Sequence, residues 1–453
     1  MSEIVVLDTP ALGDHGYLAG AGGVAFVVDP QRDIDRVLDA AAERGWTITD
    51  VFETHVHNDY VSGGLELARA TGARYHVAAG DEVAFERNPI EPGDEVAVGP
   101  LRVRAVATPG HTFTHLSYVL TAPGRAPAVF TGGSLLLGST GRPDLLGPEH
   151  GEELARAQHA SARRLADELP DATEVYPTHG FGSFCSATPT ERTASTIGAE
   201  KRRNPVLTQD EEAYVTELLG GLDDYPAYYA RLGAVNAAGP APADLSPPGR
   251  ADAAELRRRL EAGEWLVDLR DRTAFAAGHL RGSLNFGLDG SFAVHLGWLI
   301  PWGTPVTLLG ATAADVAEAQ RELVRIGIDR PAASATGSPQ AWAGDAKPET
   351  LRLATFAELA AVRHHRRVTV LDVRRRSEWD DSHIAGALHV PLHDLADRVG
   401  TLPDGEIWVH CASGYRASIA ASLLAAAGLP AVTIDDDYAT AVELGLTENA
   451  CHI

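Results

Sequence analysis

The stretch ETHVHNDYVSGG, residues 53–64, decides the fold of the first half of the chain. It follows a short apolar run that predicts a strand and precedes residues 65–70, which predict a helix. His55, His57 and Asp59 therefore place two imidazoles and a carboxylate on one turn at the end of a strand. Neutral imidazole and carboxylate are ligands that zinc and iron accept. The stretch indicates a divalent metal site, with a purely structural histidine pair as the alternative.

Two further histidines follow predicted strands in the same way. His111 lies in TPGHT, residues 108–112, after the alternating run of residues 101–106. His179 lies in YPTHG, residues 176–180, after another short apolar run. Loops at one edge of a layered α/β domain bring such side chains together. The two segments therefore strengthen the prediction of a metal site.

In chain order these segments read H-x-H-x-D, PGHT and YPTHG. That order resembles the metallo-β-lactamase fold, and most of all its persulfide dioxygenase (sulfur dioxygenase) branch, including members fused to rhodanese domains. The resemblance covers essentially all 453 residues. It implies an α/β chain in which an αββα metallo-β-lactamase sandwich over residues 1–240 is followed by two α/β rhodanese-like domains. It also implies a set of metal ligands, drawn from His55, His57, Asp59, His111 and His179.

Two positions depart from the family pattern. The family usually carries a second histidine directly after the aspartate, where this chain has Tyr60. Its F-T-G-D segment, whose aspartate completes a two-histidine-one-carboxylate iron site in the dioxygenases, reads FTGGS at residues 130–134, with Gly133 at the carboxylate position. The following GRPD, residues 141–144, matches the family again, which indicates that the segment is aligned correctly.

The missing carboxylate changes the expected metal chemistry. The resemblance leaves His55 and His111 as the surviving imidazoles of the iron triad. Substitute ligands from the same cavity would be His57, Asp59 and His179. A metal held by neutral imidazoles keeps its full positive charge and lacks the carboxylate that favours ferrous iron over zinc. We therefore expect an altered site for Fe(2+), with Zn(2+) as the alternative.

Composition excludes several other classes of protein. A chain of 453 residues fits three domains, and 45% hydrophobic residues fill globular cores. A net charge of −24 argues against nucleic acid and anionic membrane as partners. No signal peptide and no apolar run long enough to span a bilayer are visible. The three cysteines are too few and too scattered for a disulfide framework, so we expect a cytoplasmic protein.

Three local features of the first domain carry expectations of their own. The amphipathic run of residues 34–46 predicts a helix with Asp33 as its N-cap. Residues 222–236, with three tyrosines, form either a wall of the substrate pocket or packing against the sandwich. Cys185 is either a reactive thiol near the metal or, as is more usual for free cysteine, a small buried residue.

The second half of the chain contains an internal duplication. After a linker rich in Ala, Pro and Gly at residues 237–248, the pattern of residues 265–285 recurs at residues 369–389. In both copies D-x-R ends a strand, and an aromatic residue and G-H or S-H follow. A repeat at about one hundred residues indicates two similar α/β domains. Both resemble rhodanese domains, and we assign them to residues 250–345 and 350–453.

The second copy carries the strongest chemical signal, CASGYR at residues 411–416, between a predicted strand and a predicted helix. A cysteine at this place faces backbone N–H groups and the positive end of the helix dipole, both of which stabilise an anionic sulfur. Cys411 is therefore the predicted nucleophile or persulfide carrier, and Arg416 a fixed charge for an anionic donor. The C-x4-R spacing is typical of sulfurtransferases. The first copy lacks the cysteine, and Cys451 lies outside any such context.

Together with these features, the resemblance implies a fused sulfur-metabolism enzyme, a persulfide dioxygenase and thiosulfate sulfurtransferase. The resemblance implies oxidation of a low-molecular-weight thiol persulfide by O2 at a non-haem metal, and sulfur exchange through Cys411 with thiosulfate or sulfite. We further expect a homo-oligomer. One alternative is a zinc-dependent thioester hydrolase of the glyoxalase II type with a rhodanese appendage. Another is a sulfurtransferase whose first domain is catalytically silent.

Overall fold

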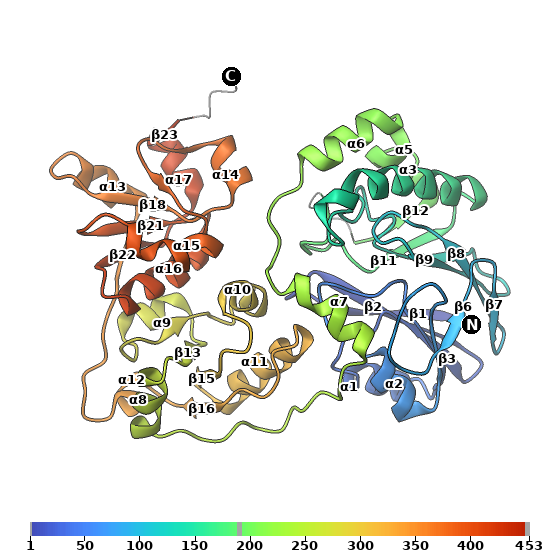
Figure 1. Ribbon diagram of the computed structural model, residues 1–453, viewed down its shortest axis with the longest axis horizontal. Helices are drawn as coiled ribbons and strands as arrows, with labels where there is room; N and C mark the ends of the chain where they lie inside the picture. The colour runs from blue at the N-terminus through green and yellow to red at the C-terminus, as the bar shows by residue number, and fades with distance from the viewer. Residues whose placement is uncertain (1, 188–192, 449–453) are drawn as a thin grey trace. The chain divides into compact units, whose positions relative to one another are not determined.

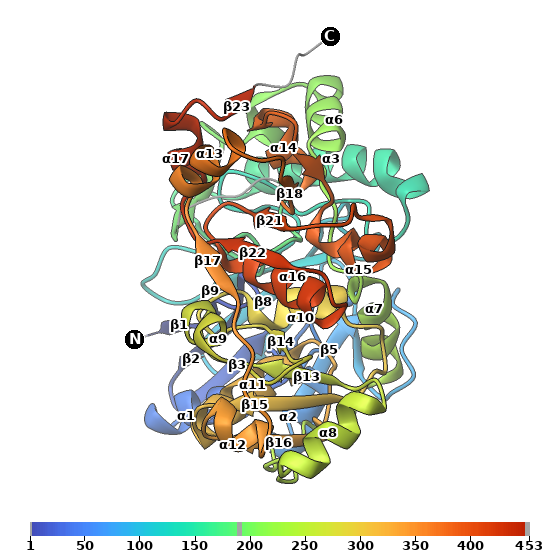
Figure 2. The same ribbon diagram turned by 90° about the vertical axis from the view of Figure 1, so that its left-hand side faces the viewer.

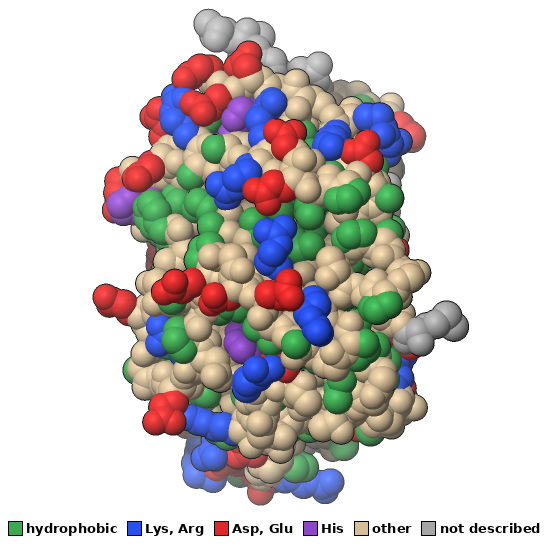
Figure 3. Space-filling model, turned by 90° about the vertical axis from the view of Figure 1, so that its right-hand side faces the viewer, with side chains coloured by type: hydrophobic (Ala, Val, Ile, Leu, Met, Phe, Trp, Pro, Cys, Tyr) green, Lys and Arg blue, Asp and Glu red, His purple; other side chains and the backbone are tan. Residues whose placement is uncertain are grey.

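The computed structural model describes residues 2–187 and 193–448 (Figure 1). The chain divides into two compact units, Met1–Asp244 with Val324–Gly327, and Leu245–Leu323 with Ile328–Ile453. Within the described residues, no helix is both long and apolar enough to cross a membrane. On the face drawn in Figure 3, acidic side chains are interspersed with basic ones.

The first unit is built on two six-stranded sheets. The first sheet runs in sequence order: β1 (Glu3–Thr9), β2 (Asp14–Ala21), β3 (Val24–Val28), β4 (Thr47–Phe52), β5 (Arg74–Ala78) and β6 (Asn88–Ile90). The second has the order β12-β11-β10-β9-β8-β7, formed by β7 (Glu95–Val98), β8 (Leu101–Ala107), β9 (Leu116–Thr121), β10 (Ala128–Gly132), β11 (Glu174–Pro177) and β12 (Ser195–Thr196). Both sheets mix parallel and antiparallel pairs.

Helices cover the outer face of each sheet (Figure 1). The first sheet carries α1 (Asp35–Glu43) and α2 (Gly64–Thr71). The second carries α3 (Gly151–Glu168), α5 (Pro205–Thr208) and α6 (Glu211–Gly220), and the unit also contains α4 (Ile197–Glu200) and α7 (Tyr229–Ala238). The layers are therefore α, β, β, α, which confirms the predicted sandwich.

Strand β3 shows why the sequence folds this way. Its five residues, VAFVV, are all apolar, which is expected of a strand that is buried on both faces. Successive side chains of a strand point to opposite faces. Phe26 and Val28 accordingly join the core between the two sheets, whereas Ala25 and Val27 join the core under α1 and α2.

Helix α1 corrects one sequence-based prediction. The residue at the N-cap is Ile34, and it makes no side-chain capping bond, so the assignment of Asp33 as the N-cap was wrong. The carboxylate of Asp33 instead pairs with Arg36 Nε at 2.7 Å. A buried carboxylate gains more from a guanidinium than from one backbone N–H.

The second unit contains the two repeats, each built on a parallel sheet. The first repeat orders its strands β14-β13-β15-β16 and comprises β13 (Trp265–Asp268), β14 (Leu284–Asn285), β15 (Val306–Gly310), β16 (Ala333–Thr336), α8 (Ala253–Glu261), α9 (Arg272–Ala277), α10 (Phe292–Leu299), α11 (Ala313–Arg325) and α12 (Pro339–Ala343). The domain boundaries at residues 240–250 and 345–350 stay predictions.

The second repeat orders its strands β17-β22-β21-β18-β20. It comprises β17 (Arg352–Ala354), β18 (Thr369–Asp372), β20 (Leu388–His389), β21 (Ile407–His410), β22 (Ala431–Ile434), α13 (Phe356–Arg363), α14 (Arg376–Asp381), α15 (Leu395–Arg398), α16 (Tyr415–Ala426) and α17 (Tyr438–Glu443). Strands β19 (His383–Ile384) and β23 (Thr447–Glu448) form a separate pair. Helix α16 packs against β21 and β22 (Figure 2).

The repeated D-x-R pattern has the same structural role in both copies. Arg270 turns back onto Asp268 (Nη2–Oδ2, 2.5 Å), and Arg374 turns back onto Asp372 (Nη2–Oδ2, 2.7 Å). In each copy the same nitrogen also donates to a backbone carbonyl eight residues further on. The pair therefore fastens the segment after the helix to the end of the strand. The duplication inferred from the sequence is a duplication of structure.

Candidate metal centre and cysteine loop

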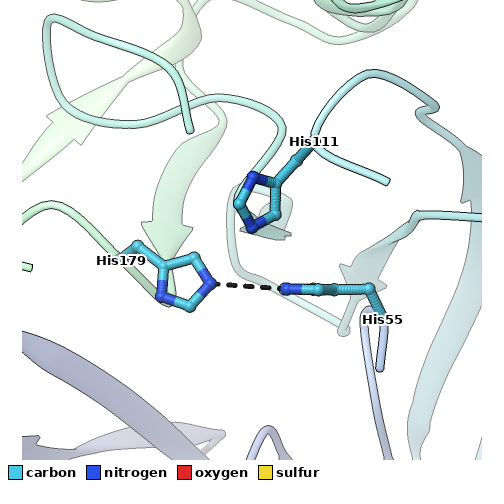
Figure 4. A group of neighbouring side chains, drawn as sticks. All are labelled: His55, His111 and His179. Carbon is cyan, nitrogen blue, oxygen red and sulfur yellow. Dashed lines mark hydrogen bonds between the residues drawn. The ribbon is translucent and has the colours of Figure 1, made fainter. Parts of the chain in front are cut away.

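The five predicted metal ligands lie together at one edge of the sandwich. His55, His57 and Asp59 follow β4, His111 follows β8, and His179 follows β11. All five side chains are almost completely buried. Nitrogen atoms of His55, His111 and His179 lie within 4.8 Å of one another, and His57, Asp59 and His179 form a second such group. Figure 4 shows the rings of the first group converging on one point.

Outer hydrogen bonds fix which nitrogen of each ring faces the centre. His111 Nδ1 lies 2.8 Å from the Arg142 carbonyl, which only accepts, so Nδ1 carries the hydrogen. His55 Nδ1 lies 2.9 Å from Thr54 Oγ1, whose own hydrogen is donated to a carboxylate. His179 Nδ1 lies 2.9 Å from Asp14 Oδ1. With Nδ1 bonded in this way, each ring presents Nε2 to the centre, so the donor set fits a metal.

His57 is oriented differently from the other three histidines. Its Nε2 lies 3.3 Å from both Asp29 Oδ1 and Glu53 Oε2, and 2.9 Å from the Tyr60 hydroxyl. Burial opposes a charge on this ring, but Asp29 outweighs it and the pKa of His57 rises well above its ordinary value. Its Nδ1 has no hydrogen-bond partner among the described residues. His57 therefore offers the cavity only Nδ1.

Charges around His179 set its protonation state before a metal binds. Burial favours the neutral ring, but Asp59 and then Asp14 outweigh it and raise the pKa of His179 to about 9. Burial and then Asp59 raise the pKa of Asp14 to about 7. Burial lowers the pKa of His111 to about 3, with the charge on His179 as the next cause. A metal at the three Nε2 atoms would therefore replace the proton on His179.

Gly133 stands where the family has a carboxylate, and the structure gives no room for one. A Cβ added at Gly133 would lie 2.2 Å from His111 Cδ2 and 2.5 Å from His111 Cγ. The opposite edge of the ring faces Gly141, whose added Cβ would lie 2.7 Å from His111 Nδ1. The imidazole of His111 is thus held between two glycines, and it fills the space of the missing side chain.

Several residues of the site were not predicted from the sequence. Asp14 holds His179, Asp29 and Glu53 hold His57, and His115 Nε2 accepts the backbone N–H of Gly133 at 3.1 Å. Asp29 directly follows β3 and has a positive φ of 50°. The only sequence signal for its role was an acidic residue at the end of a predicted strand. Asp14 is 165 residues from its partner and gave no signal.

Helix α7, in the tyrosine-rich segment, holds the metal-ligand loop. Asn236 Nδ2 donates to the carbonyls of His57 and Tyr60, each at 2.8 Å, and its Oδ1 accepts the N–H of Ser62 at 2.9 Å. The hydroxyl of Tyr228 is buried and has no hydrogen-bond partner among the described residues. Asp59 and Asp14 are close enough to add to the effect of burial in raising the pKa of this tyrosine. The segment therefore packs against the metal-ligand loop, and its Asn236 lines a pocket together with His55 and His57.

Cys185 is fully buried beside the same carboxylates. Burial, then Asp59, raises the pKa of its thiol well above the ordinary value. A thiol in this state is a poor nucleophile. Of the two interpretations offered by the sequence, the structure favours the small buried residue.

The cysteine loop of the second repeat has the predicted geometry. Cys411 directly follows β21, and α16 begins at Tyr415. The backbone N–H of Gly414 donates to Cys411 Sγ at 3.2 Å, and Gly414 has a positive φ of 94°, which favours glycine. Burial lowers the pKa of the preceding His410 to about 4, so this ring adds no charge at neutral pH.

Arg416 is bound within its own domain. Its Nη1 and Nη2 donate to the two oxygens of Glu378 at 2.6 and 2.7 Å. Such a bidentate pair engages both terminal nitrogens of the guanidinium. The role predicted for Arg416, a fixed charge for an incoming anion, stays a prediction. Cys451 lies outside the described residues.

Comparisons with known proteins match both halves of the chain. A family model described as the metallo-beta-lactamase superfamily matches residues 15–179. A model described as the rhodanese-like domain matches residues 252–345 and 355–437. Both are enzyme-type domains, and the first supports a metal cofactor at the histidine cluster.

Similar proteins were found among curated sequences and solved structures. A hydroxyacylglutathione hydrolase from Pseudomonas putida (strain GB-1) is 31% identical over 211 residues, covering 41% of this chain and 77% of the relative. The solved metallo-beta-lactamase from Staphylococcus aureus subsp. aureus COL has a TM-score of 0.66 and 26% identity, covering 74% of this chain and 99% of its own. The solved ETHE1 from Myxococcus xanthus has a TM-score of 0.46 and 32% identity, covering 52% and 98%. The chain belongs to the metallo-beta-lactamase superfamily, and two rhodanese-like domains follow its metallo-beta-lactamase domain.

Proposed function

We propose that the chain is a sulfur-metabolism enzyme that transfers sulfane sulfur through a persulfide on Cys411 and oxidises low-molecular-weight persulfides at its histidine-rich centre. The observation that carries the proposal is the hydrogen bond from Gly414 N–H to Cys411 Sγ at the start of α16. Backbone N–H groups and a helix N-terminus stabilise both a thiolate and the terminal sulfur of a persulfide. We place this chemistry in the cytoplasm, where thiols stay reduced.

The transfer reaction needs no redox partner. The Cys411 thiolate attacks the outer sulfur of thiosulfate, the S–S bond to the sulfonate breaks, and sulfite leaves with the electron pair. Cys411 is then Cys–S–S⁻. A second nucleophile such as cyanide attacks the terminal sulfur, leaves as thiocyanate, and regenerates the thiolate. Charge and atoms balance in both steps.

The first unit would oxidise persulfides, the class of compound that also carries sulfane sulfur. His55, His111 and His179 would hold the metal, which when bound supplies a positively charged anchor for an anionic sulfur substrate. The overall reaction is RSS⁻ + O2 + H2O → RSH + SO3²⁻ + H⁺. In it the outer sulfur is oxidised and O2 is reduced. Sulfite and sulfane sulfur are the species that Cys411 exchanges, which is why the two activities suit one chain.

A second candidate function is supported by the donor set itself. Three neutral imidazoles without a carboxylate suit zinc, and a zinc-bound water is a hydrolytic nucleophile. A relative in the comparisons is named hydroxyacylglutathione hydrolase. On this reading the first unit hydrolyses a thioester and the sulfurtransferase activity of Cys411 is unchanged.

Two measurements test the proposal. Cys411→Ser is expected to abolish transfer of sulfur from thiosulfate to cyanide, whereas the matched variant Cys451→Ser is expected to retain it. Retained activity in Cys411→Ser would contradict the assignment. Elemental analysis of the purified protein, with oxygen uptake measured on glutathione persulfide, then separates the candidates. Iron with oxygen uptake supports oxidation, and zinc with thioester cleavage supports hydrolysis.

A further inference from the structure

Arg416, the cation expected to meet an anionic sulfur donor at Cys411, already binds a carboxylate with both of its terminal nitrogens. Both terminal nitrogens of Arg416 are bound to Glu378, and Arg375 Nε lies 3.5 Å from the same carboxylate. His410 is neutral at neutral pH because burial lowers its pKa to about 4. Thiosulfate carries two negative charges, so a second cation beside Arg416 favours its approach to a thiolate.

Such a cation reaches the loop from the cysteine-less repeat. Arg272, the first residue of α9, lies against Gly414, the residue that donates to the cysteine sulfur. A Cβ added at Gly414 would lie 2.4 Å from Asp435 Oδ1 and 3.0 Å from Arg272 Nε. The Arg272–Asp435 pair therefore lies against the residue whose backbone N–H contacts Cys411 Sγ.

The contacts of Arg272 hold it in place, and among the described residues they leave its Nη2 without a hydrogen-bond partner. Its Nε donates to Asp435 Oδ1, and its Nη1 lies 3.4 Å from Asp289 Oδ2. Neither contact uses Nη2. The side chain is 29% exposed, so the guanidinium is accessible to a small anion. Cys411 is among the groups that raise the pKa of Arg272, as it is for Arg416, so both arginines lie near the cysteine.

The cysteine loop is fastened to the same repeat by a second contact. The hydroxyl of Tyr415 donates to the Gly287 carbonyl at 2.8 Å. The Tyr415 ring covers Gly290, where an added Cβ would lie 2.4 Å from the ring. His295 packs edge-on against this ring at 5.5 Å, and burial lowers its pKa to about 4, so it is neutral as well. The loop and Arg272 are thereby held in a fixed relation.

We propose that Arg272 binds the sulfonate end of an anionic sulfur donor at Cys411, so that the cysteine-less repeat forms one side of the sulfur-transfer site. This inference rests on the proposed function of Cys411. Arg272 is a binding and positioning residue, and it takes no part in bond making. It explains why a repeat without a nucleophile is kept in contact with the cysteine loop.

The test measures the local charge without using the sulfurtransferase activity. Native full-length protein is alkylated with iodoacetate, which is an anion, or with iodoacetamide, which is neutral, and the Cys411 peptide is quantified by mass spectrometry. Relative to wild type, Arg272→Gln is expected to lower the iodoacetate-to-iodoacetamide rate ratio about fivefold, as loss of one nearby charge predicts. Arg272→Lys is expected to keep most of the ratio. Arg281→Gln removes an 84% exposed arginine of the same repeat and is the control expected to change nothing.

Two further results decide the interpretation. Arg272→Gln leaves Asp435 without its partner, so the double variant R272Q/D435N removes that acid as well. A ratio still about threefold below wild type in the double variant assigns the effect to the lost cation, and a ratio equal to wild type overturns the proposal. In turnover, Arg272→Gln is expected to raise KM for thiosulfate about tenfold with kcat nearly unchanged. Failure of the Cys411→Ser test would refute sulfur transfer but leave the alkylation result standing.

Discussion

Gly133→Asp puts back the carboxylate that the family carries, and sequence comparison alone would expect it to complete a metal triad. The structure predicts the opposite result. A Cβ at position 133 would lie 2.2 Å from His111 Cδ2 and 2.8 Å from His111 Nε2. Carbon atoms in contact are normally about 3.5–4.0 Å apart, so the His111 ring must retreat by more than about 1 Å.

The size of the effect follows from that displacement. Metal–ligand distances tolerate changes of about 0.2 Å, so a ring moved by 1 Å no longer ligates in place. We expect metal affinity to fall by at least about 10–100-fold, the loss seen when even an outer partner of a ligand is removed. Crowding in a packed interior adds a loss of about 1–3 kcal/mol in the free energy of unfolding.

The assay compares three variants by metal content and by urea unfolding of the metal-free protein. Gly133→Ala carries only the Cβ and is expected to lose metal as Gly133→Asp does. Gly220→Ala adds a Cβ in open space and is expected to match wild type. Gly133→Asp with stoichiometric metal and an unchanged unfolding midpoint would refute the reasoning, because it would show that His111 moves freely.

Three other results are expected. Asn236→Ala removes three buried hydrogen bonds to the backbone of residues 57–62. It should lower the free energy of unfolding, measured by urea denaturation, by about 2–4 kcal/mol. A loss below about 0.5 kcal/mol would show that the metal-ligand loop does not depend on α7. Because the pKa of His179 is raised to about 9, zinc binding at pH 7 should release about one proton from this ring, and zinc affinity should rise with pH up to about 9. Calorimetry in buffers of different ionisation enthalpy measures the number of protons released. Zinc binding without proton release would contradict the prediction. Burial opposes ionisation of Glu378, but Arg416 outweighs it and lowers the pKa from 4.5 to about 2. A carboxyl group whose pKa is lower in the folded state stabilises the folded protein at pH values above its unfolded-state pKa. The stability advantage of wild type over Glu378→Gln should therefore be full above about pH 5 and be lost as the pH falls towards 2. An advantage that does not change over this range would exclude the Glu378–Arg416 pair as its source.

Local sequence patterns determined the elements and their order. Fully apolar runs predicted buried strands such as β3, and the spacing of H-x-H-x-D, PGHT and YPTHG placed the histidines at strand ends. The repeated D-x-R predicted two similar domains, and CASGYR predicted a strand, a loop and a helix around Cys411. These signals are local because side-chain periods of two and 3.6 residues are set by the backbone itself.

The tertiary structure alone decided which side chains meet. His179 reaches Asp14 from 165 residues away and His55 from 124 residues away. Arg416 is bound to Glu378, and Arg272 of one repeat lies beside Gly414 of the other. Such contacts depend on how sheets and repeats pack, and packing is fixed by the summed burial of many apolar residues. The sequence around a polar side chain therefore does not indicate its distant partner. The geometry of the metal ligands, the contact of Gly133 with His111 and the cations near Cys411 could be known only from the folded chain.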